Sequence, residues 1–284
     1  MWYNISNWVN DMSNLKGYLI AVDLDDTLVT GFSNMDVESF DKLKSLAKDN
    51  TIIIATGRPN RSSINFYNYI GLDTILINYN GAWIHNPKDP SFTPVCHFMK
   101  KEYVFDLIRG CRDDIVNIFS EIGDDIYLEH YDEITRPFLH EDGANLHIGN
   151  LEEILPSDPA GAIVFAKEGS QERLEKYVDE TFKGEVLIRL WNKTNPVVAE
   201  FYTPQIDKGM MIERIRQYYN IDKEKTIAFG DGHNDIQMIT SVRYGVAMAN
   251  SHPALLEVAK YVTSSVYEHG VKVFLEKLEN GEIE

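Results

Sequence analysis

Cysteine is scarce in this sequence. Only two of its 284 residues are cysteines, Cys96 and Cys111, and they form no C-x-x-C pair. Two thiols at this spacing cannot build a thiolate metal site by themselves. A chain of this length buries a sizeable core without disulfides, so a reducing compartment is the simplest expectation.

Positive charge is also scarce. The sequence has 27 Lys and Arg against 44 Asp and Glu, which gives a formal net charge of −17. Nucleic-acid phosphates would be repelled by such a chain, so we expect no nucleic-acid partner. A phosphorylated substrate would need a local positive centre, supplied by a metal ion or by a few well-placed cations.

Long apolar runs are missing as well. The longest, 19–22 and 52–55, are far shorter than the roughly 20 residues that cross a bilayer. Residues 1–16 lack the basic start and the apolar run of a signal peptide. We therefore expect no membrane partner and a cytoplasmic protein. Trp2, Tyr3 and Trp8 could cap the core or contact a partner, and the sequence leaves this open.

Short β-branched runs alternate with helical patterns at both ends of the chain, which is typical of βα units around a parallel sheet. In the first part, strands are predicted at 18–23, 51–56 and 74–78, and helices over 36–48 and after Pro59. In the last part, the patterns predict strands at 226–230 and 244–249, and helices over 208–219, after Asn234 and from Pro253. These two parts are predicted to form one α/β domain.

The middle of the chain has a different pattern. Helices are predicted over 102–119 and 171–182, and strands at 126–130, 161–167, 185–191 and 197–202. The last two strands are close enough to pair as a hairpin, which is typical of an α+β unit. We therefore predict an α/β core domain made of residues 1–82 and 203–284, with an α+β domain inserted over residues 83–202.

Carboxylates directly follow two of the predicted strands. Asp23 and Asp25 come after the first strand, and Asp231 and Asp235 come after the strand at 226–230. Residues two apart in an extended chain share a side, and ligands bind outside the carboxyl ends of parallel strands. The two acidic loops are therefore expected to meet above the sheet. Gathered carboxylates repel one another unless a cation binds, and a hard ion such as Mg²⁺ prefers oxygen ligands.

Each acidic motif alone is also compatible with an ordinary turn, because Asp is common in turns and glycine serves where φ is positive. Two further elements favour a site. Thr56 and Gly57 follow the second strand, where a hydroxyl beside a free glycine amide can hold a phosphate oxygen. Lys208 begins a predicted helix and supplies a positive point charge. Together these elements predict a phosphate site.

The order of these motifs resembles the haloacid dehalogenase-like (HAD) superfamily of phosphohydrolases, from Lys16 to about Leu278. The motifs that carry the resemblance are Asp23-x-Asp25-x-Thr27, Thr56, Lys208 and Gly230-Asp231-x-x-Asn234-Asp235. The runs Asn80-Gly81-Ala82, Gly245-Val246-Ala247-Met248-Ala249-Asn250 and His269-Gly270-Val271 are similar to its Cof-like branch, which has a large inserted cap. The resemblance implies a Rossmann-like parallel-sheet core domain with an inserted α+β cap domain.

The resemblance also implies a two-step phosphoryl transfer. Asp23 would attack phosphorus and form an aspartyl-phosphate, and Asp25 would act as general acid and then as general base. Mg²⁺ would be held by Asp23, the backbone carbonyl of Asp25 and Asp231, with support from Asp235. Together with Lys208 the metal would offset the charge of the phosphoryl group.

The remaining phosphate oxygens would, by the same resemblance, be held by Thr56, the Gly57 amide and Asn234. Two positions differ from the commonest pattern of the branch. Asp26 stands where Gly is usual, although Asp tolerates turn conformations. His233 is either a solvent-facing loop residue or a residue that tunes the pH dependence.

The expected activity is that of a Mg²⁺-dependent phosphatase acting on a small phosphorylated metabolite, with sugar phosphates favoured by resemblance alone. A phosphomutase or another phosphotransferase would use the same nucleophile and remains an alternative. A catalytically silent binding module would be expected to have lost Asp23, Asp25, Lys208 or Asp231, and all four are present. The sequence leaves open the substrate, the cap residues that select it, and the oligomeric state.

Overall fold

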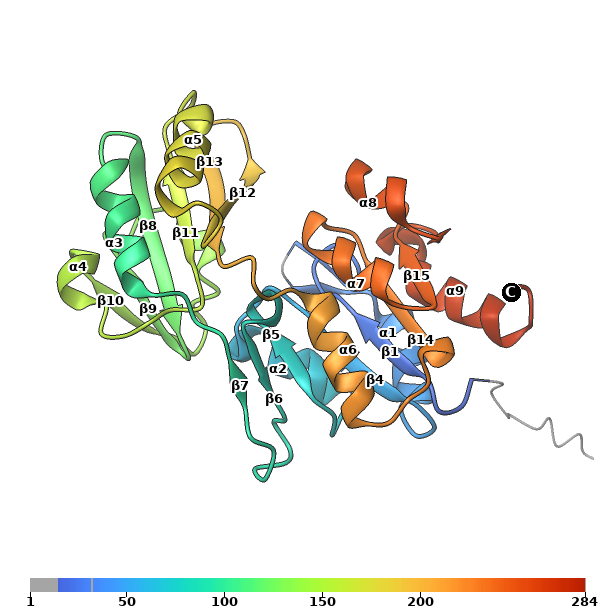
Figure 1. The fold of residues 1–284 in the computed structure, drawn as a ribbon. Coiled ribbons are helices and arrows are strands. Elements are labelled where there is room, and N and C mark those ends of the chain that lie inside the picture. The colour runs from blue at the N-terminus through green and yellow to red at the C-terminus, as the bar shows by residue number, and fades with distance from the viewer. Residues whose placement is uncertain (1–14, 32, 284) are drawn as a thin grey trace, which may run out of the picture.

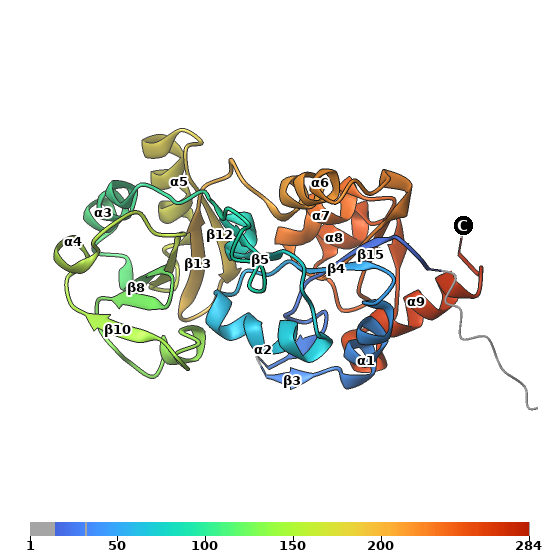
Figure 2. The same cartoon turned by 90° about the horizontal axis from the view of Figure 1, so that it is seen from below.

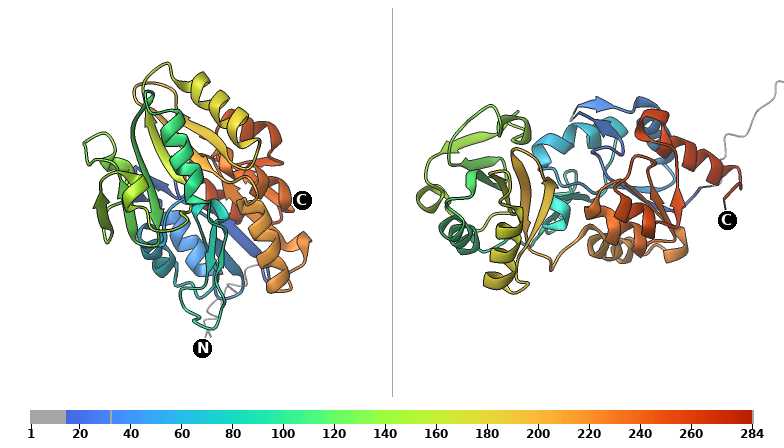
Figure 3. Two further views of the ribbon diagram at one scale, coloured as in Figure 1. Left: turned by 60° about the vertical axis from the view of Figure 1, so that its left-hand side comes forward. Right: turned by 90° about the horizontal axis from the view of Figure 1, so that it is seen from above.

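The chain folds around two separate sheets that lie in opposite halves of the molecule (Figure 1). The structure is a computed structural model that describes residues 15–31 and 33–283. The first and last parts of the chain share one half, and the middle part forms the other (Figure 3). The expectations for Trp2, Tyr3 and Trp8 fall outside the described residues.

The first sheet is five-stranded and parallel, with the order β16-β15-β14-β1-β4. Its strands are β1 (Leu19–Val22), β4 (Thr51–Ile54), β14 (Thr226–Gly230), β15 (Tyr244–Ala247) and β16 (Tyr261–Val262). All four residues of the interior strand β1 are fully buried, as a parallel strand covered on both faces requires. The neighbours β1, β4 and β14 therefore end at one edge of the sheet.

Helices cover both faces of this sheet (Figure 2). On one face lie α1 (Val37–Leu46), α2 (Asn60–Ile70) and α9 (Gly270–Glu279), and on the other lie α6 (Lys208–Tyr218), α7 (Ile236–Ser241) and α8 (Pro253–Val258). Each face has its own apolar core, because alternate residues of β1 point to opposite sides: Ile20 packs in one core and Ala21 in the other. This is the doubly covered parallel sheet that the sequence predicts.

Two small antiparallel sheets adjoin the core. The strands β2 (Val29–Thr30) and β3 (Asn34–Met35) pair, and β5 (Leu76–Asn78), β6 (Trp83–His85) and β7 (Val95–Cys96) form a three-stranded sheet. A parallel bridge between Ala55 and Ile77 continues the order from the end of β4 to β5. The domain boundaries at 82/83 and 202/203 stay a prediction. Within the predicted cap range, β6 pairs with β5 and β7 pairs with β6, so neither belongs to the second large sheet.

The second large sheet is mixed and six-stranded, with the order β10-β9-β8-β11-β13-β12. Its strands are β8 (Ile115–Ile122), β9 (Asp125–Leu128), β10 (Asn145–Ile148), β11 (Ala162–Ala166), β12 (Leu187–Asn192) and β13 (Val197–Tyr202). The helices of this half are α3 (Lys101–Gly110), α4 (Leu151–Ile154) and α5 (Gln171–Phe182). The predicted hairpin is confirmed, because β12 and β13 pair antiparallel.

One helix of this half was predicted too long. The pattern over 102–119 gave a single helix, but α3 ends at Gly110 and β8 begins at Ile115. Both segments are rich in apolar residues, and the turn between them contains no proline to mark the break. Apart from this segment, the α/β fold with a parallel-sheet core and a separate mixed-sheet cap agrees with the prediction. No helix in the described part of the chain is long and apolar enough to cross a membrane.

Gly209 lies where α6 packs against α7. A Cβ at this position would be 2.4 Å from the carbonyl oxygen of Gln237 and 3.0 Å from the amide nitrogen of Met238. Because both are backbone atoms, an added methyl group would force the two helices apart. We expect Gly209→Ala to lower the free energy of unfolding by about 1–3 kcal/mol and to displace the neighbouring Lys208, measured by urea denaturation and by turnover.

Met210→Ala is the matched control for this prediction. Met210 belongs to the same turn of α6 and is 50 % exposed, so its truncation should change the free energy of unfolding by no more than about 0.5 kcal/mol. Equal stability of Gly209→Ala and the parent protein would contradict the close approach of the two helices.

Candidate active site

The loop after β1 turns back on itself at the carboxyl edge of the core sheet. The amide of Asp23 still donates to the carbonyl oxygen of Phe229 at 3.1 Å, so Asp23 continues the strand and is buried. Asp26 takes a φ of 52°, a left-handed conformation in which glycine is usual and Asp is tolerated. Its carbonyl oxygen accepts from Asn250 Nδ2 at 2.7 Å, which ties the loop to the segment after β15.

The loop after β14 is folded around one carboxylate. Asp235 is fully buried, and its Oδ2 accepts from the amides of Asp231 at 3.1 Å and Gly232 at 2.9 Å. A Cβ on Gly230 would lie 2.5 Å from the Asp235 carboxyl carbon, so only glycine fits beside it. Asp235 therefore sets the shape of this loop, and Asp231 is presented toward the first loop.

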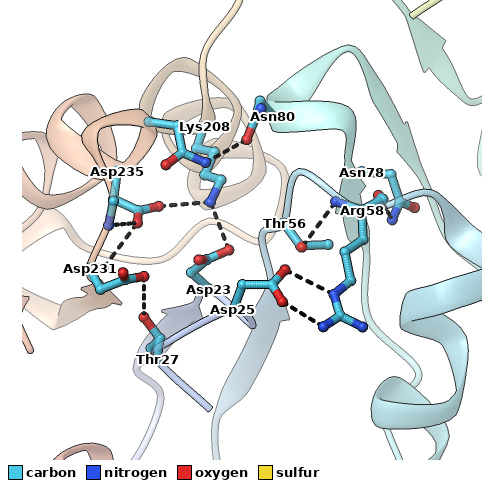
Figure 4. Close-up of polar contacts among 12 residues, drawn as sticks. Asp23, Asp25, Thr27, Thr56, Arg58, Asn78, Asn80, Lys208, Asp231 and Asp235 are labelled. Atoms are coloured by element: carbon cyan, nitrogen blue, oxygen red, sulfur yellow. Dashed lines mark hydrogen bonds and ion pairs between the residues drawn. The ribbon is translucent and has the colours of Figure 1, made fainter. Parts of the chain in front are cut away.

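Lys208 joins the two loops (Figure 4). It is the first residue of α6 and is fully buried, and its Nζ lies 2.8 Å from Asp23 Oδ1 and 2.7 Å from Asp235 Oδ1. The helix start is fixed by Asp207, whose side chain accepts from the amide of Met210 at 2.8 Å. Burial lowers the pKa of Lys208, but the charges of Asp23 and Asp235 outweigh it and hold this pKa above its ordinary value.

Three carboxylates surround one point of this site. Asp23, Asp231 and Asp235 each offer an oxygen within 4.8 Å of the others, and Thr27 Oγ1 donates to Asp231 at 3.2 Å. The pKa of Asp23 is raised to about 7. Burial is the main cause, the charges of Asp235 and Asp25 raise this pKa further, and Lys208 lowers it. Burial, together with the charges of Asp23 and Asp235, raises the pKa of Asp231 to about 9.

Three carboxyl groups gather around the Lys208 ammonium, so the cluster carries more negative charge than Lys208 offsets when these groups are ionised. A divalent cation that prefers oxygen ligands would remove this excess, so the residues present fit such an ion. The oxygens left for it belong to Asp23 and Asp231, because both oxygens of Asp235 already accept hydrogen bonds from Lys208 and the loop amides.

Asp25 is held by an arginine that the sequence did not assign. Arg58 Nε and Nη2 donate to the two oxygens of the Asp25 carboxylate at 2.9 and 2.5 Å (Figure 4). The guanidinium is 4 % exposed and lies over the ring of Phe66, 5.3 Å from its centroid. Arg58 directly follows Thr56 and Gly57 in the sequence, and in this structure it binds the second aspartate of the first motif.

Thr56 and Gly57 lie at the end of β4, as predicted. The Thr56 hydroxyl is fully buried and accepts from the Arg58 amide at 3.1 Å, and Gly57 lines the cavity above the carboxylates. A Cβ on Gly57 would be 3.2 Å from Asn80 Oδ1, so glycine lets Asn80 approach closely.

A chain of side-chain hydrogen bonds runs from the core loops into the second sheet. Asn234 Nδ2 donates to Asn80 Oδ1 at 2.8 Å, and Asn80 Nδ2 donates to Glu200 Oε1 at 2.8 Å. Asn80 has a φ of 55°, a left-handed turn conformation, and its side chain connects the two halves. Glu200 on β13 could not be found from the sequence, because its motif context is that of an ordinary strand.

Arg61 forms the other link between the halves. From α2 its guanidinium donates to the carbonyl oxygens of Leu139 at 3.0 Å, His140 at 3.1 Å and Gly123 at 3.2 Å, and it forms an ion pair with Glu121 on β8. Burial raises the pKa of Glu121, and the charge of Arg61 opposes this rise.

A cavity of about 890 Å³ lies between these links. At its core end it is lined by Asp23, Asp25, Gly57, Asp231, Asn234 and His233. The other end is formed by residues of β8, β11, β12 and β13. His233 therefore faces the cavity, where burial and the nearby Arg189 lower its pKa. The arrangement places a buried carboxylate, a buried ammonium and an acidic cluster at the core end of a substrate-sized space.

Comparison with known proteins points to one family. Residues 20–275 match the haloacid dehalogenase-like hydrolase family. The chain is 30 % identical to the 5-amino-6-(5-phospho-D-ribitylamino)uracil phosphatase YitU of Bacillus subtilis, over 92 % of this chain and 97 % of that protein. It is 23 % identical to the phosphatase YwpJ of the same organism, over 92 % of this chain and 99 % of that protein.

Solved structures agree at the level of the fold. A haloacid dehalogenase-like hydrolase from Bacteroides thetaiotaomicron superposes with a TM-score of 0.79 at 24 % identity, over 93 % of this chain and all of that one. The subclass IIB sugar phosphatase BT4131 superposes with a TM-score of 0.76 at 24 % identity, over 94 % of this chain and all of that one. With a match over most of its length, the chain belongs to the haloacid dehalogenase-like hydrolase family, in its Cof-like branch, and is a phosphatase.

Proposed function

We propose that this protein is a Mg²⁺-dependent phosphatase that hydrolyses a small phosphorylated metabolite through an aspartyl-phosphate on Asp23. The observation that supports this most is the position of Asp23, a buried carboxylate 2.8 Å from the Lys208 ammonium at the core end of the cavity. A carboxylate there is shielded from water, and a cation is already beside it to offset the charge of a phosphoryl group.

In the first step, an oxygen of Asp23 bonds to phosphorus while the bond from phosphorus to the leaving oxygen breaks. Asp25 gives its proton to that leaving oxygen. In the second step, Asp25 takes a proton from water, the water oxygen bonds to phosphorus, and the Asp23 carboxylate is released. Arg58 keeps Asp25 in place from the first step to the second, because its two hydrogen bonds fix the plane of the carboxylate.

Mg²⁺ would be held by Asp23, the backbone carbonyl of Asp25 and Asp231, with Asp235 supporting the loop. When bound, the ion withdraws electron density from the phosphoryl oxygens and neutralises part of their charge. Lys208 provides the second positive charge. Thr56, the Gly57 amide and Asn234 would hold the remaining oxygens, so the phosphoryl group is oriented from three sides.

The substrate class follows from size and from the relatives. The cavity of about 890 Å³ is far larger than a phosphoryl group, so the leaving group is a metabolite of moderate size. Sugar phosphates and sugar-alcohol phosphates are the first candidates. The ribitylamino-uracil phosphate in the name of the B. subtilis relative is such a compound, and BT4131 is named as a sugar phosphatase.

Phosphate release from an aryl phosphate and from a panel of sugar phosphates at neutral pH tests the proposal. We expect turnover with Mg²⁺ and loss of turnover by at least about 100-fold after chelation, since an electrostatic contribution of this kind is worth that much. Ca²⁺ is the control ion, because it accepts the same oxygen ligands but not the tight octahedral geometry. Full activity after chelation, or no release from any compound of the panel, would overturn the proposal.

A further inference from the structure

The end of the cavity far from Asp23 has its own chemistry. It is lined by aromatic and aliphatic side chains of the cap, among them Phe119, Phe138, Ile163, Trp191 and Tyr202. The phosphoryl site lies at the other end, so these residues face the leaving group. A wall of this kind favours a flat apolar surface over a hydroxyl-covered one.

One charged donor is built into this wall. Arg189 on β12 lies opposite Glu200 on β13, and its Nη1 donates to Glu200 Oε2 at 3.0 Å. The guanidinium also stacks on Tyr202, with 4.3 Å from its carbon to the ring centroid. Arg189 is thus fixed on one edge and one face before any ligand arrives, which lowers the entropy lost on binding.

The other donors of Arg189 lack partners. Its Nε is buried without a hydrogen-bond acceptor, and its Nη2 forms no hydrogen bond with the residues that the structure describes. A donor left unpaired costs free energy, and a ligand oxygen that reaches the open Nη2 would give it a partner. Arg189 lines the cavity and its side chain is 18 % exposed, so a ligand can reach the guanidinium.

The local charge decides which kind of acceptor fits. The Arg189 charge is offset by Glu200, and the other charged cap residues of the lining are Glu121 and Glu175 against Lys193. The cap end of the cavity therefore has no excess of positive charge for a second phosphate or carboxylate. A neutral acceptor, such as a ring carbonyl, needs only the open donors.

We propose that Arg189, stacked on Tyr202, donates a hydrogen bond to a carbonyl oxygen on a flat, uncharged ring in the leaving group and so recognises this ring. The substrate class is then a phosphomonoester whose ring is separated from the phosphate by the length of the cavity, as in a ring-bearing polyol phosphate. This inference rests on the proposed phosphatase function and goes beyond it, because it assigns the specificity-determining residue and the chemistry that it selects.

A comparison of two substrates distinguishes the contribution of the Arg189 subsite from that of the phosphoryl site. Flavin mononucleotide and ribitol 5-phosphate share the polyol phosphate, and only the first has a flat ring with carbonyl oxygens. We expect the parent protein to prefer flavin mononucleotide in kcat/KM. Arg189→Gln should lower kcat/KM for flavin mononucleotide about 10- to 100-fold, the effect of one lost hydrogen bond from a charged donor, and leave ribitol 5-phosphate nearly unchanged.

Arg173→Gln is the matched control, because Arg173 is an exposed cap arginine paired with Asp114 on the outside of the domain. An equal loss for both substrates in Arg189→Gln would overturn the inference, since Arg189 would then act on the core through Glu200 and Asn80. A parent protein that cleaves ribitol 5-phosphate as well as the flavin would also overturn it.

Binding of riboflavin, the dephosphorylated product, is measured in parallel by fluorescence. Weaker binding to Arg189→Gln than to Arg173→Gln supports the subsite without any turnover, and equal binding contradicts it. The failure of the phosphatase proposal would be recognised separately, as the absence of phosphate release from every phosphomonoester including the aryl phosphate.

Discussion

Asp23→Asn is expected to lower kcat by a factor of about 10⁴ or more, the scale seen when a nucleophile is removed. The amide oxygen of asparagine is a poor nucleophile, so the covalent step with phosphorus is blocked. Lys208 keeps its second partner, Asp235, at 2.7 Å, and the buried pair remains in place. The loss should therefore come from chemistry and not from unfolding.

The same substitution should leave the metal-free protein at least as stable as the parent. The folded-state pKa of Asp23 is raised to about 7, above the ordinary value of 3.8 that an unfolded chain would show. For a carboxyl with a raised folded pKa, stability falls as pH rises between these two values, because the folded protein must hold an unfavourable charge. Asparagine removes that charge, so the gain should be present at pH 8 and absent below about pH 4.

Asp36→Asn is the matched control for Asp23→Asn. Asp36 is also buried and also in the core half, but it begins α1, where its side chain accepts from the amide of Ser39 at 3.3 Å. Asparagine caps a helix equally well, so turnover should stay near that of the parent. Rapid acid quenching with mass spectrometry should find one phosphoryl group on the parent and none on Asp23→Asn. Undiminished turnover of Asp23→Asn would exclude Asp23 as the nucleophile.

The core fold could be predicted because its signals are local. The strand at 226–230 and the helix over 171–182 match the structure residue for residue, since short β-branched runs and a period near 3.6 are properties of neighbouring residues. The same holds for the approach of Asp23 to Asp231, which follows from the parallel pairing of β1 with β14. The parallel pairing of these two strands brings two motifs that are distant in the sequence together in one site.

The contacts between the halves could not be predicted, because they depend on how two separately folded units meet. Arg61 reaches Glu121 across 60 residues, and Asn80 reaches Glu200 across 120. A single sequence has no periodic or motif signal for such pairs. The same reason hides Arg189, whose significance comes from the cavity wall and not from its neighbours in β12.

The second large effect is expected at Lys208, which lies between two buried carboxylates. Lys208→Met keeps the length of the side chain but removes its charge, so Asp23 and Asp235 lose their common partner. Breaking a buried ion pair by removing one member costs about 3–5 kcal/mol. We expect the free energy of unfolding to fall by about this amount, and turnover to fall at least about 100-fold because the cation beside the phosphoryl group is lost.

The pH dependence distinguishes charge from packing in this variant. Without Lys208 the carboxylates lose the interaction that lowers the pKa of Asp23, so that pKa rises beyond about 7. Protonation then relieves the repulsion at low pH, and the stability deficit of Lys208→Met should be small near pH 5 and grow toward pH 9. Urea denaturation in the presence of a chelator measures the deficit at each pH.

Lys272→Met serves as the control, since Lys272 also pairs with a carboxylate, Glu38 at 2.7 Å, but on the surface. Exposed ion pairs contribute little to the free energy of unfolding, so this variant should be nearly as stable as the parent at every pH. Adding Asp235→Asn to Lys208→Met should restore part of the stability, because one of the two uncompensated charges is removed. A deficit that is the same at pH 5 and pH 9 would instead mean that Lys208 acts through packing, and the electrostatic explanation of the site would fail.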